Sequence, residues 1–481
     1  QAEDGIRDCL LSRGLGDVFK RQPKDFHWQT SSTGSNSDAR RVRYLIAMTS
    51  VLVKGTIRTF DPTCPTARSI VLRDGVVAEI NSENCETDSV LQLAPGETLQ
   101  PGWRDDHTHL LSTLATRCSV DLSEVGSIDQ LLQRLAVSAP GRNGWLRGAR
   151  FEPSFLKEQR NPTRADLDSV ASEFPIVLHD QTGHVAVVNT KAARELGVPE
   201  DSDGVLVERE DILSRAPRLD WRDLTQAASL TFQDWAQKGL VAITDATHTN
   251  DASSLQTLGE LLVICEGPQI TAMVGADRLG NLRYGDVHNG VRVGHAKVMP
   301  DVAVRNDISG LIKEAHEKGF PVAIHVMDID VLEEVLQALS KSAPPVATQD
   351  RLEHCSLALP EQLDRVAELG LRVCTQPSFL LHRLKKYVLE LSPIEQQWLW
   401  PLASLLDRQI DVSLSSDSPV VPADPEEWIQ VATDRPIAHS EEISDSEART
   451  LTIVSPMEVG MPSDLLVTVS GSEYGTLASR N

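Results

Sequence analysis

The sequence predicts an α/β protein whose main part is a (β/α)8 barrel of the TIM type, with a small β-sandwich domain built from both ends of the chain. Three observations support this. Strand-like and helix-like segments alternate through residues 290–414, residue types that bind metals stand at the ends of several strands, and the strand count closes at eight. Repeated βα units predict a parallel sheet, and barrel enzymes place functional residues at the carboxyl ends of the strands.

The alternation is clearest after residue 290. A helix is predicted to begin at the N-cap Asn306 and to end before Gly319, and a second helix begins at Pro360, a residue favoured in a first helical turn. The expected strands of this half are Gly294–Met299, Pro321–Val326, Arg351–Cys355, Leu371–Gln376 and Ile410–Leu414. Earlier strands are expected at residues 101–109, Gly239–Asp245 and Gln269–Val274.

Six residues at or near these strand ends are candidate metal ligands: His107, His109, Lys297, His325, His354 and Asp417. Side chains at i and i+2 of a strand point the same way, so His107 and His109 would present two imidazoles to one face. The His pair alone is a weak motif. The whole set, in this order on successive strands, predicts one site.

The rest of the chain divides around this barrel. Residues 1–47 show no sustained period and are expected to be disordered or a non-native extension. Residues 48–100 and 450–481 are expected to form the composite β-sandwich domain, in which Asp74-Gly75 joins two strands as a hairpin. The barrel would span 101–449, with an insertion at about 112–235 that overhangs the site.

Composition limits the partners. The chain has 46 basic and 69 acidic residues and a net charge of −23, which argues against nucleic acid or an anionic membrane surface as a partner. No apolar stretch reaches the length of a membrane span. Its 7 cysteines contain no C-x-x-C pair and fit a reducing compartment, so we expect a cytoplasmic location. We also expect a small-molecule substrate and a homodimer.

The ligand order, within a β-unit shared by both ends, resembles the amidohydrolase superfamily. Further segments resemble amidohydrolase family 3, which includes N-substituted formamide deformylases: Trp145–Gly148, Gly183–Asn189, Arg351–His354, Gly370–Pro377 and Ser416–Val420. The resemblance spans about residues 50–470. It departs where the connection from Thr450–Ile453 to Gly460–Asp464 is shorter than usual.

The resemblance implies a hydrolase that cleaves a non-peptide carbon–nitrogen bond with metal-activated water. Neutral imidazole and carboxylate suit Zn²⁺. With two ions, His107, His109 and Asp417 would hold one, His325 and His354 the other, and Lys297 would bridge them as an N6-carboxylated carbamate. With one ion, Lys297 stays unmodified and His354 orients the substrate. Asp417 is the expected general base and then acid.

Weaker candidates and other functions stay open. His184, Asp245, His248 and Gln376 are candidate substrate-binding residues, and residues 379–400 could wall the pocket. A structural role is an equal alternative for His184. The alternative functions are hydrolytic deamination of a ring amine, hydrolysis of a cyclic amide, and an inactive binding protein with a relic metal site.

Overall fold

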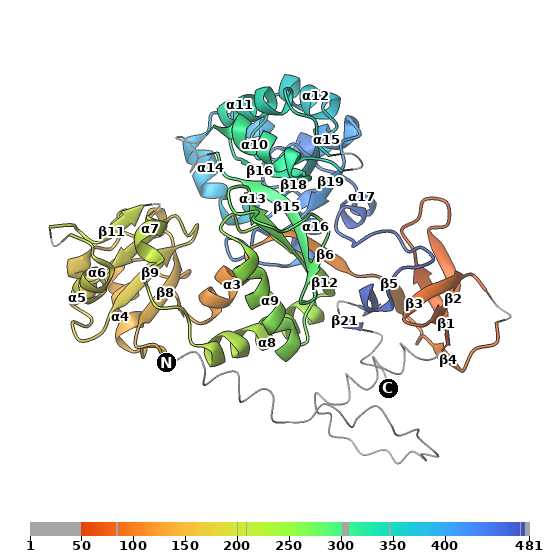
Figure 1. Cartoon of the computed structure of the whole chain (residues 1–481), viewed down its shortest axis with the longest axis horizontal. Helices are drawn as coiled ribbons and strands as arrows, with labels where there is room; N and C mark the ends of the chain where they lie inside the picture. The colour runs from red at the N-terminus through yellow and green to blue at the C-terminus, as the bar shows by residue number, and fades with distance from the viewer. Residues whose placement is uncertain are drawn as a thin grey trace, which may run out of the picture.

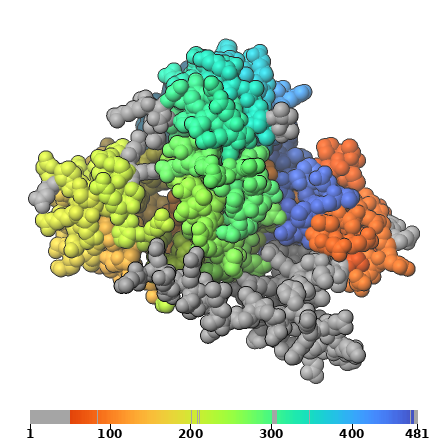
Figure 2. All heavy atoms as spheres, in the orientation of Figure 1, coloured from red at the N-terminus to blue at the C-terminus, as the bar shows by residue number. Residues whose placement is uncertain are grey.

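The computed structural model describes residues 50–476 except 83–84, 200, 208, 301–306, 346–347 and 472. The expectations for residues 1–47 and for the N-cap Asn306 therefore lie outside the described residues. The described chain forms three sheets. In Figure 1 the barrel occupies the centre, with the insertion (yellow) and the terminal sheet (orange to red) on opposite sides, and Figure 2 shows the same division in all heavy atoms.

The central sheet contains a nearly closed barrel of eight parallel strands, in the order β19-β18-β17-β16-β15-β13-β12-β6, and a ninth strand, β14 Val287–His288, pairs antiparallel with β15. The bounds of its strands are β6 Trp103–Thr108, β12 Leu240–Asp245, β13 Gln269–Gly275, β15 Val291–Val298, β16 Val322–Val326, β17 Arg351–His354, β18 Arg372–Thr375 and β19 Val412–Leu414. The loop after β19 connects the last strand to the first strand, β6. In this loop Asp417 N donates to His107 O at 2.7 Å, and His109 N donates to Ser418 O at 2.8 Å. The predicted α/β barrel is confirmed.

Helices cover the outside of this barrel, and the longer ones bury an apolar face at helical spacing. They are α8 Trp221–Gln237, α9 Ala252–Ile264, α10 Ile308–Glu317, α11 Ile329–Leu339, α12 Pro360–Glu368, α15 Leu402–Asp407, α16 Pro425–Thr433 and α17 Asp445–Thr450. Asp307 is the N-cap of α10, and Gly319 follows the helix at φ +81°. Short helices α13 Phe379–His382 and α14 Leu384–Glu390 follow β18.

The segment between β6 and β12 contains two parts. Five strands form a separate sheet in the order β11-β10-β9-β8-β7, from Val120 to Val207. Their bounds are β7 Val120–Asp121, β8 Leu146–Phe151, β9 Ile176–Asp180, β10 Val185–Val188 and β11 Val205–Val207, with α4 Ile128–Ala136, α5 Arg164–Asp168, α6 Thr190–Leu196 and α7 Glu210–Leu213. By contrast, α8 shares the barrel core through Phe232 and Trp235, so it belongs to the barrel's outer layer.

The third sheet joins both ends of the described chain. It runs β21-β20-β5-β1-β2-β3, with β4 paired to β1. The bounds are β1 Val51–Arg58, β2 Thr66–Arg73, β3 Val76–Ile80, β4 Ser89–Gln92, β5 Glu97–Pro101, β20 Leu466–Ser470 and β21 Glu473–Thr476. The expected hairpin is present, with Asp74 and Gly75 at φ +52° and +76°. In the part of the chain that the structure describes, no helix combines the length and the apolar character needed to cross a bilayer.

Candidate metal centre

The six candidate ligands converge at the carboxyl end of the barrel. His107 lies near the end of β6, and His109 is the N-cap of α3 (Leu110–Arg117). Lys297, His325 and His354 lie at or near the ends of β15, β16 and β17. Asp417 follows β19 in the loop that joins the ring. Parallel strands thus bring residues from distant parts of the chain to one rim.

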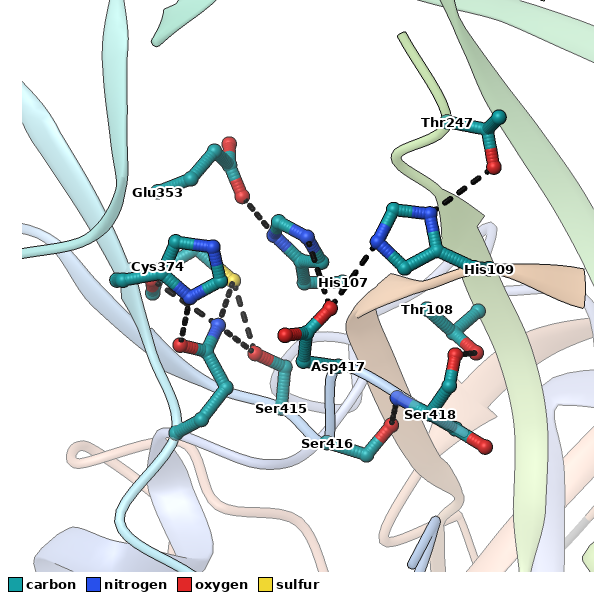
Figure 3. Close-up of polar contacts among 12 residues, drawn as sticks. His107, Thr108, His109, Thr247, Glu353, Cys374, Ser415, Ser416, Asp417 and Ser418 are labelled. Carbon is teal, nitrogen blue, oxygen red and sulfur yellow. Dashed lines mark hydrogen bonds and ion pairs between the residues drawn. The ribbon is translucent and has the colours of Figure 1, made fainter. Parts of the chain in front are cut away.

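Asp417 lies between the two imidazoles of the His-x-His pair (Figure 3). Its Oδ1 is 3.0 Å from His109 Nε2 and 3.4 Å from His107 Nε2. Donor atoms of these three residues all lie within 4.8 Å of one another, which is compatible with one bound ion. The mixed imidazole and carboxylate set suits Zn²⁺ and related divalent ions.

The other histidines continue this cluster across the barrel. The His354 ring centroid is 4.7 Å from that of His107 and 4.7 Å from that of His325. His354 Nδ1 is 2.7 Å from Gln376 Oε1. An amide oxygen only accepts hydrogen bonds, so Nδ1 carries the proton and Nε2 keeps its lone pair. Gln376, proposed from the sequence as a substrate-binding residue, therefore supports His354.

Two of these side chains depend on a left-handed backbone. His354 and Asp417 have φ of +68° and +64°, a region that non-glycine residues rarely adopt and that clusters at functional sites. Glu353 contacts His107, so regular strand alternation would turn its neighbour His354 outward. The positive φ of His354 breaks this alternation, so the side chains of Glu353 and His354 both point toward the inside of the barrel.

Although burial opposes it, the hydrogen bond with Asp417 raises the pKa of His109. Burial keeps the other three histidines of the cluster neutral. It lowers the pKa of His107 to about 3, with the Lys297 charge acting in the same direction, and lowers the pKa of His354 and, further, of His325. Burial also lowers the pKa of Lys297, whose Nζ has no hydrogen-bond partner among the described residues. Neutral imidazoles beside a buried, unpartnered amine are the groups that a metal centre with a modified lysine would use. The residues present therefore fit such a centre.

A buried charged pair lies behind His107, and sequence reasoning assigned it no role. Glu353 Oε2 accepts a hydrogen bond from His107 Nδ1, and Arg351 donates to both Glu353 oxygens, with Nη2 at 2.9 Å from Oε2. The sequence contained one signal for this pair. Arg351 and Glu353 are two positions apart in a short buried strand, so their opposite charges share the inward face, where each charge needs a partner. Thr247, whose Oγ1 is 3.0 Å from His109 Nδ1, left no such signal.

The remaining candidates have other positions. The Asp245 carboxylate accepts from Leu110 N at 2.7 Å and from Asn250 Nδ2 at 2.7 Å, so it fixes the start of α3 and the loop after β12. His248 lies in that loop and is half-buried. His184 is exposed in the turn between β9 and β10. The three are not part of the cluster around Asp417 that Figure 3 draws.

The insertion contacts the rim near this cluster. Gln181 Nε2 donates to Val420 O at 3.4 Å, in the loop that carries Asp417. Arg383 Nη2, at the start of α14, pairs with Glu152 Oε2 of the insertion at 3.0 Å. The Phe379 ring in α13 lies 6.4 Å from the His354 ring. The segment after β18 thus contacts the insertion through Arg383 and lies near the histidine cluster through Phe379.

Comparisons with known proteins agree with this architecture. Residues 94–435 match the model of the amidohydrolase family. An N-substituted formamide deformylase from Arthrobacter pascens is 25% identical, over 84% of this chain and 88% of the relative. The putative amidohydrolase YtcJ from Bacillus subtilis is 24% identical, over 72% and 75%. An uncharacterized metal-dependent hydrolase from Pyrococcus horikoshii superposes with a TM-score of 0.70 at 19% identity, covering 88% of this chain and 97% of that one.

Proposed function

Because the chain belongs to the amidohydrolase family, we propose that it is a metal-dependent hydrolase that cleaves a non-peptide carbon–nitrogen bond, in an N-substituted amide of the formamide type. The observation that carries the proposal is the cluster of His107, His109 and Asp417, with donor atoms within 4.8 Å of one another. The formamide deformylase of Arthrobacter pascens supports the choice of bond. The reaction would consume an amide and water and yield a carboxylic acid and an amine.

His107, His109 and Asp417 would hold one divalent ion, His325 and His354 a second. When bound, an ion such as Zn²⁺ supplies a Lewis acid that polarises an amide carbonyl and makes water more acidic. Lys297 would complete the set as a carbamate, because its neutral amine, which burial favours, can attack CO2 and release one proton. If Lys297 stays an amine, a single ion on His107, His109, His325 and Asp417 is the alternative.

Asp417 is the proton carrier of this proposal. Burial alone would raise its pKa, but the hydrogen bond from His109 holds the pKa below the usual range of a carboxyl group. The carboxylate is therefore ionised at neutral pH, so it can accept a proton from the attacking water. The same oxygen can then return this proton to the leaving nitrogen.

His354 would be a ligand of the second ion, because its Nε2 keeps the lone pair; orienting the substrate is its role only in the single-ion alternative. Gln376 Oε1 fixes its Nδ1 as the donor, while Gln376 Nε2 donates to Ser415 Oγ at 2.8 Å, so the amide cannot easily flip. A fixed ring places the free Nε2 in one direction. Phe379, packed on the His354 ring, excludes water from that side.

Metal analysis followed by a substrate screen tests the proposal. Protein purified without chelator is expected to carry about two divalent ions per chain, and Lys297→Ala to lose one ion and the activity. The screen covers N-substituted formamides, acetamides, N-acyl amino acids and ring amines. Formate and a free amine are expected; release of ammonia from a ring amine without amide cleavage would favour the deaminase instead. A chain that keeps a single ion in both forms would exclude the carbamate.

A further inference from the structure

Glu353 is a fully buried carboxylate that faces the first metal-site strand from the other side of the barrel. It lies in β17, yet its Oε2 accepts the hydrogen bond of His107 Nδ1 in β6, 246 positions away in sequence. A carboxylate that is ionised can only accept, so this contact requires the proton of His107 to sit on Nδ1. The lone pair is thereby left on Nε2, the atom 3.4 Å from Asp417 Oδ1.

Arg351 fixes the position of this carboxylate. Its guanidinium donates to both oxygens of Glu353, and its Nη2 also donates to Asp106 O at 2.7 Å. Asp106 precedes His107, so one guanidinium holds both the carboxylate and the backbone of the strand that carries the imidazole. This two-point contact of a guanidinium with both carboxylate oxygens is the geometry of an ionised Glu353.

A second arrangement of these atoms would make Glu353 itself a ligand. Donor atoms of His107, Glu353 and Cys374 also lie within 4.8 Å of one another. Both oxygens of Glu353 are already taken by Arg351 and His107, however. Burial raises the pKa of the Cys374 thiol to about 12, whereas metals bind the thiolate. This set therefore lacks the free donors that an ion needs.

We propose that Glu353, held by Arg351, is a positioning residue that fixes the His107 tautomer and ring so that Nε2 points into the metal centre. The inference rests on the proposed function, because it gives His107 the role of a metal ligand. Outer hydrogen-bond partners of metal-ligating histidines typically change metal affinity 10–100-fold when they are mutated. Such a change in affinity can be measured without any substrate.

The test compares the natural chain with Glu353→Gln, which keeps the side-chain length but removes the charge. The matched control is Glu333→Gln, because Glu333 also pairs with an arginine, Arg365 at 2.6 Å, but in a half-buried position on the outer helix α11. The Zn²⁺ dissociation constant is measured by competition with a chromophoric chelator, and the visible absorption of the Co²⁺-loaded protein is recorded. Glu353→Gln should raise the constant about 10–100-fold and shift the Co²⁺ bands, and Glu333→Gln should change neither.

Circular dichroism decides whether each variant is folded. If the uncompensated Arg351 unfolds Glu353→Gln, then Arg351→Lys replaces it, since lysine keeps the charge but loses the planar two-point grip. That variant should weaken Zn²⁺ binding in the same direction. Unchanged Zn²⁺ affinity and Co²⁺ bands in the folded variant would overturn the inference alone. A natural chain that binds no zinc would overturn the proposed metal centre as well.

Discussion

Replacing Lys297 with methionine should stabilise the metal-free protein and weaken its stabilisation by metal. The Lys297 side chain is 3% exposed, and its Nζ has no hydrogen-bond partner in the described parts of the chain. A buried polar group left unsatisfied costs about 1–3 kcal/mol. Methionine has a similar length and no such group. The metal-free Lys297→Met chain should therefore have a free energy of unfolding about 1–3 kcal/mol higher than the natural chain.

Bound metal should reduce this difference. An ion at a free concentration one hundred times its dissociation constant stabilises the folded state by about 2.7 kcal/mol. The natural chain would gain this amount, whereas the variant has lost one donor of the site and would gain less. The stability advantage of the variant should accordingly shrink by up to about 2.7 kcal/mol when zinc is present, and only the natural chain should be active.

Urea unfolding followed by circular dichroism measures both differences. Each protein is compared after dialysis against a chelator and again with added Zn²⁺. Lys313→Met is the control, because the Lys313 side chain is 71% exposed and its substitution should stay within about 0.5 kcal/mol. If metal-free Lys297→Met proved less stable than the natural chain by about 1 kcal/mol or more, the amine would not be an unsatisfied buried group, and the reasoning would be refuted.

Three further outcomes are expected. Asp417→Asn should lower kcat/KM about 10²–10⁴-fold with an unchanged circular dichroism spectrum, since it removes the proton carrier, and a variant with near-natural activity would contradict that role. Burial lowers the pKa of His179 to about 4, whereas the unfolded chain has a value of about 6.5. Between these two pH values only the unfolded chain binds the proton, so the free energy of unfolding falls with falling pH by up to roughly 3 kcal/mol. In His179→Gln the free energies of unfolding at pH 7.5 and 4.5 should differ by less than in the natural chain, and an equal pH dependence would argue against His179 as the source. Gly102→Ala should destabilise the chain by about 1–3 kcal/mol in urea unfolding, because a Cβ there would lie 2.5 Å from Val241 Cγ2, and a neutral effect would mean that β12 shifts freely.

Much of the fold follows from local patterns. The Asp74-Gly75 pair predicted a hairpin because both positions need positive φ, and the structure has both. Pro360 opens α12 and Gly319 follows α10, where the sequence predicted a helix start and a helix stop. These signals act within a few residues, so no distant contact can easily overrule them.

The site was less readable from the sequence. Its residue types could be named, because histidines, a lysine and an aspartate at successive strand ends suggest a metal centre. Their geometry could not, since strand alternation alone would turn His354 outward, and only its φ of +68° turns it toward His107. Asp245 shows the opposite case, because a carboxylate at a strand end proved to hold backbone and loop atoms together.

The sequence by itself determined the barrel, its strand order and the kinds of donor that it carries, because hydrophobic period and turn residues act over short distances. Only the tertiary structure decided which donor atoms face one another and which charges stand behind them. The contact of Glu353 with His107 joins strands on separate sides of the ring, and Arg351 supplies the opposite charge that the buried Glu353 needs. A sequence pattern does not contain the distance between Glu353 and His107, because this contact forms only when the barrel closes.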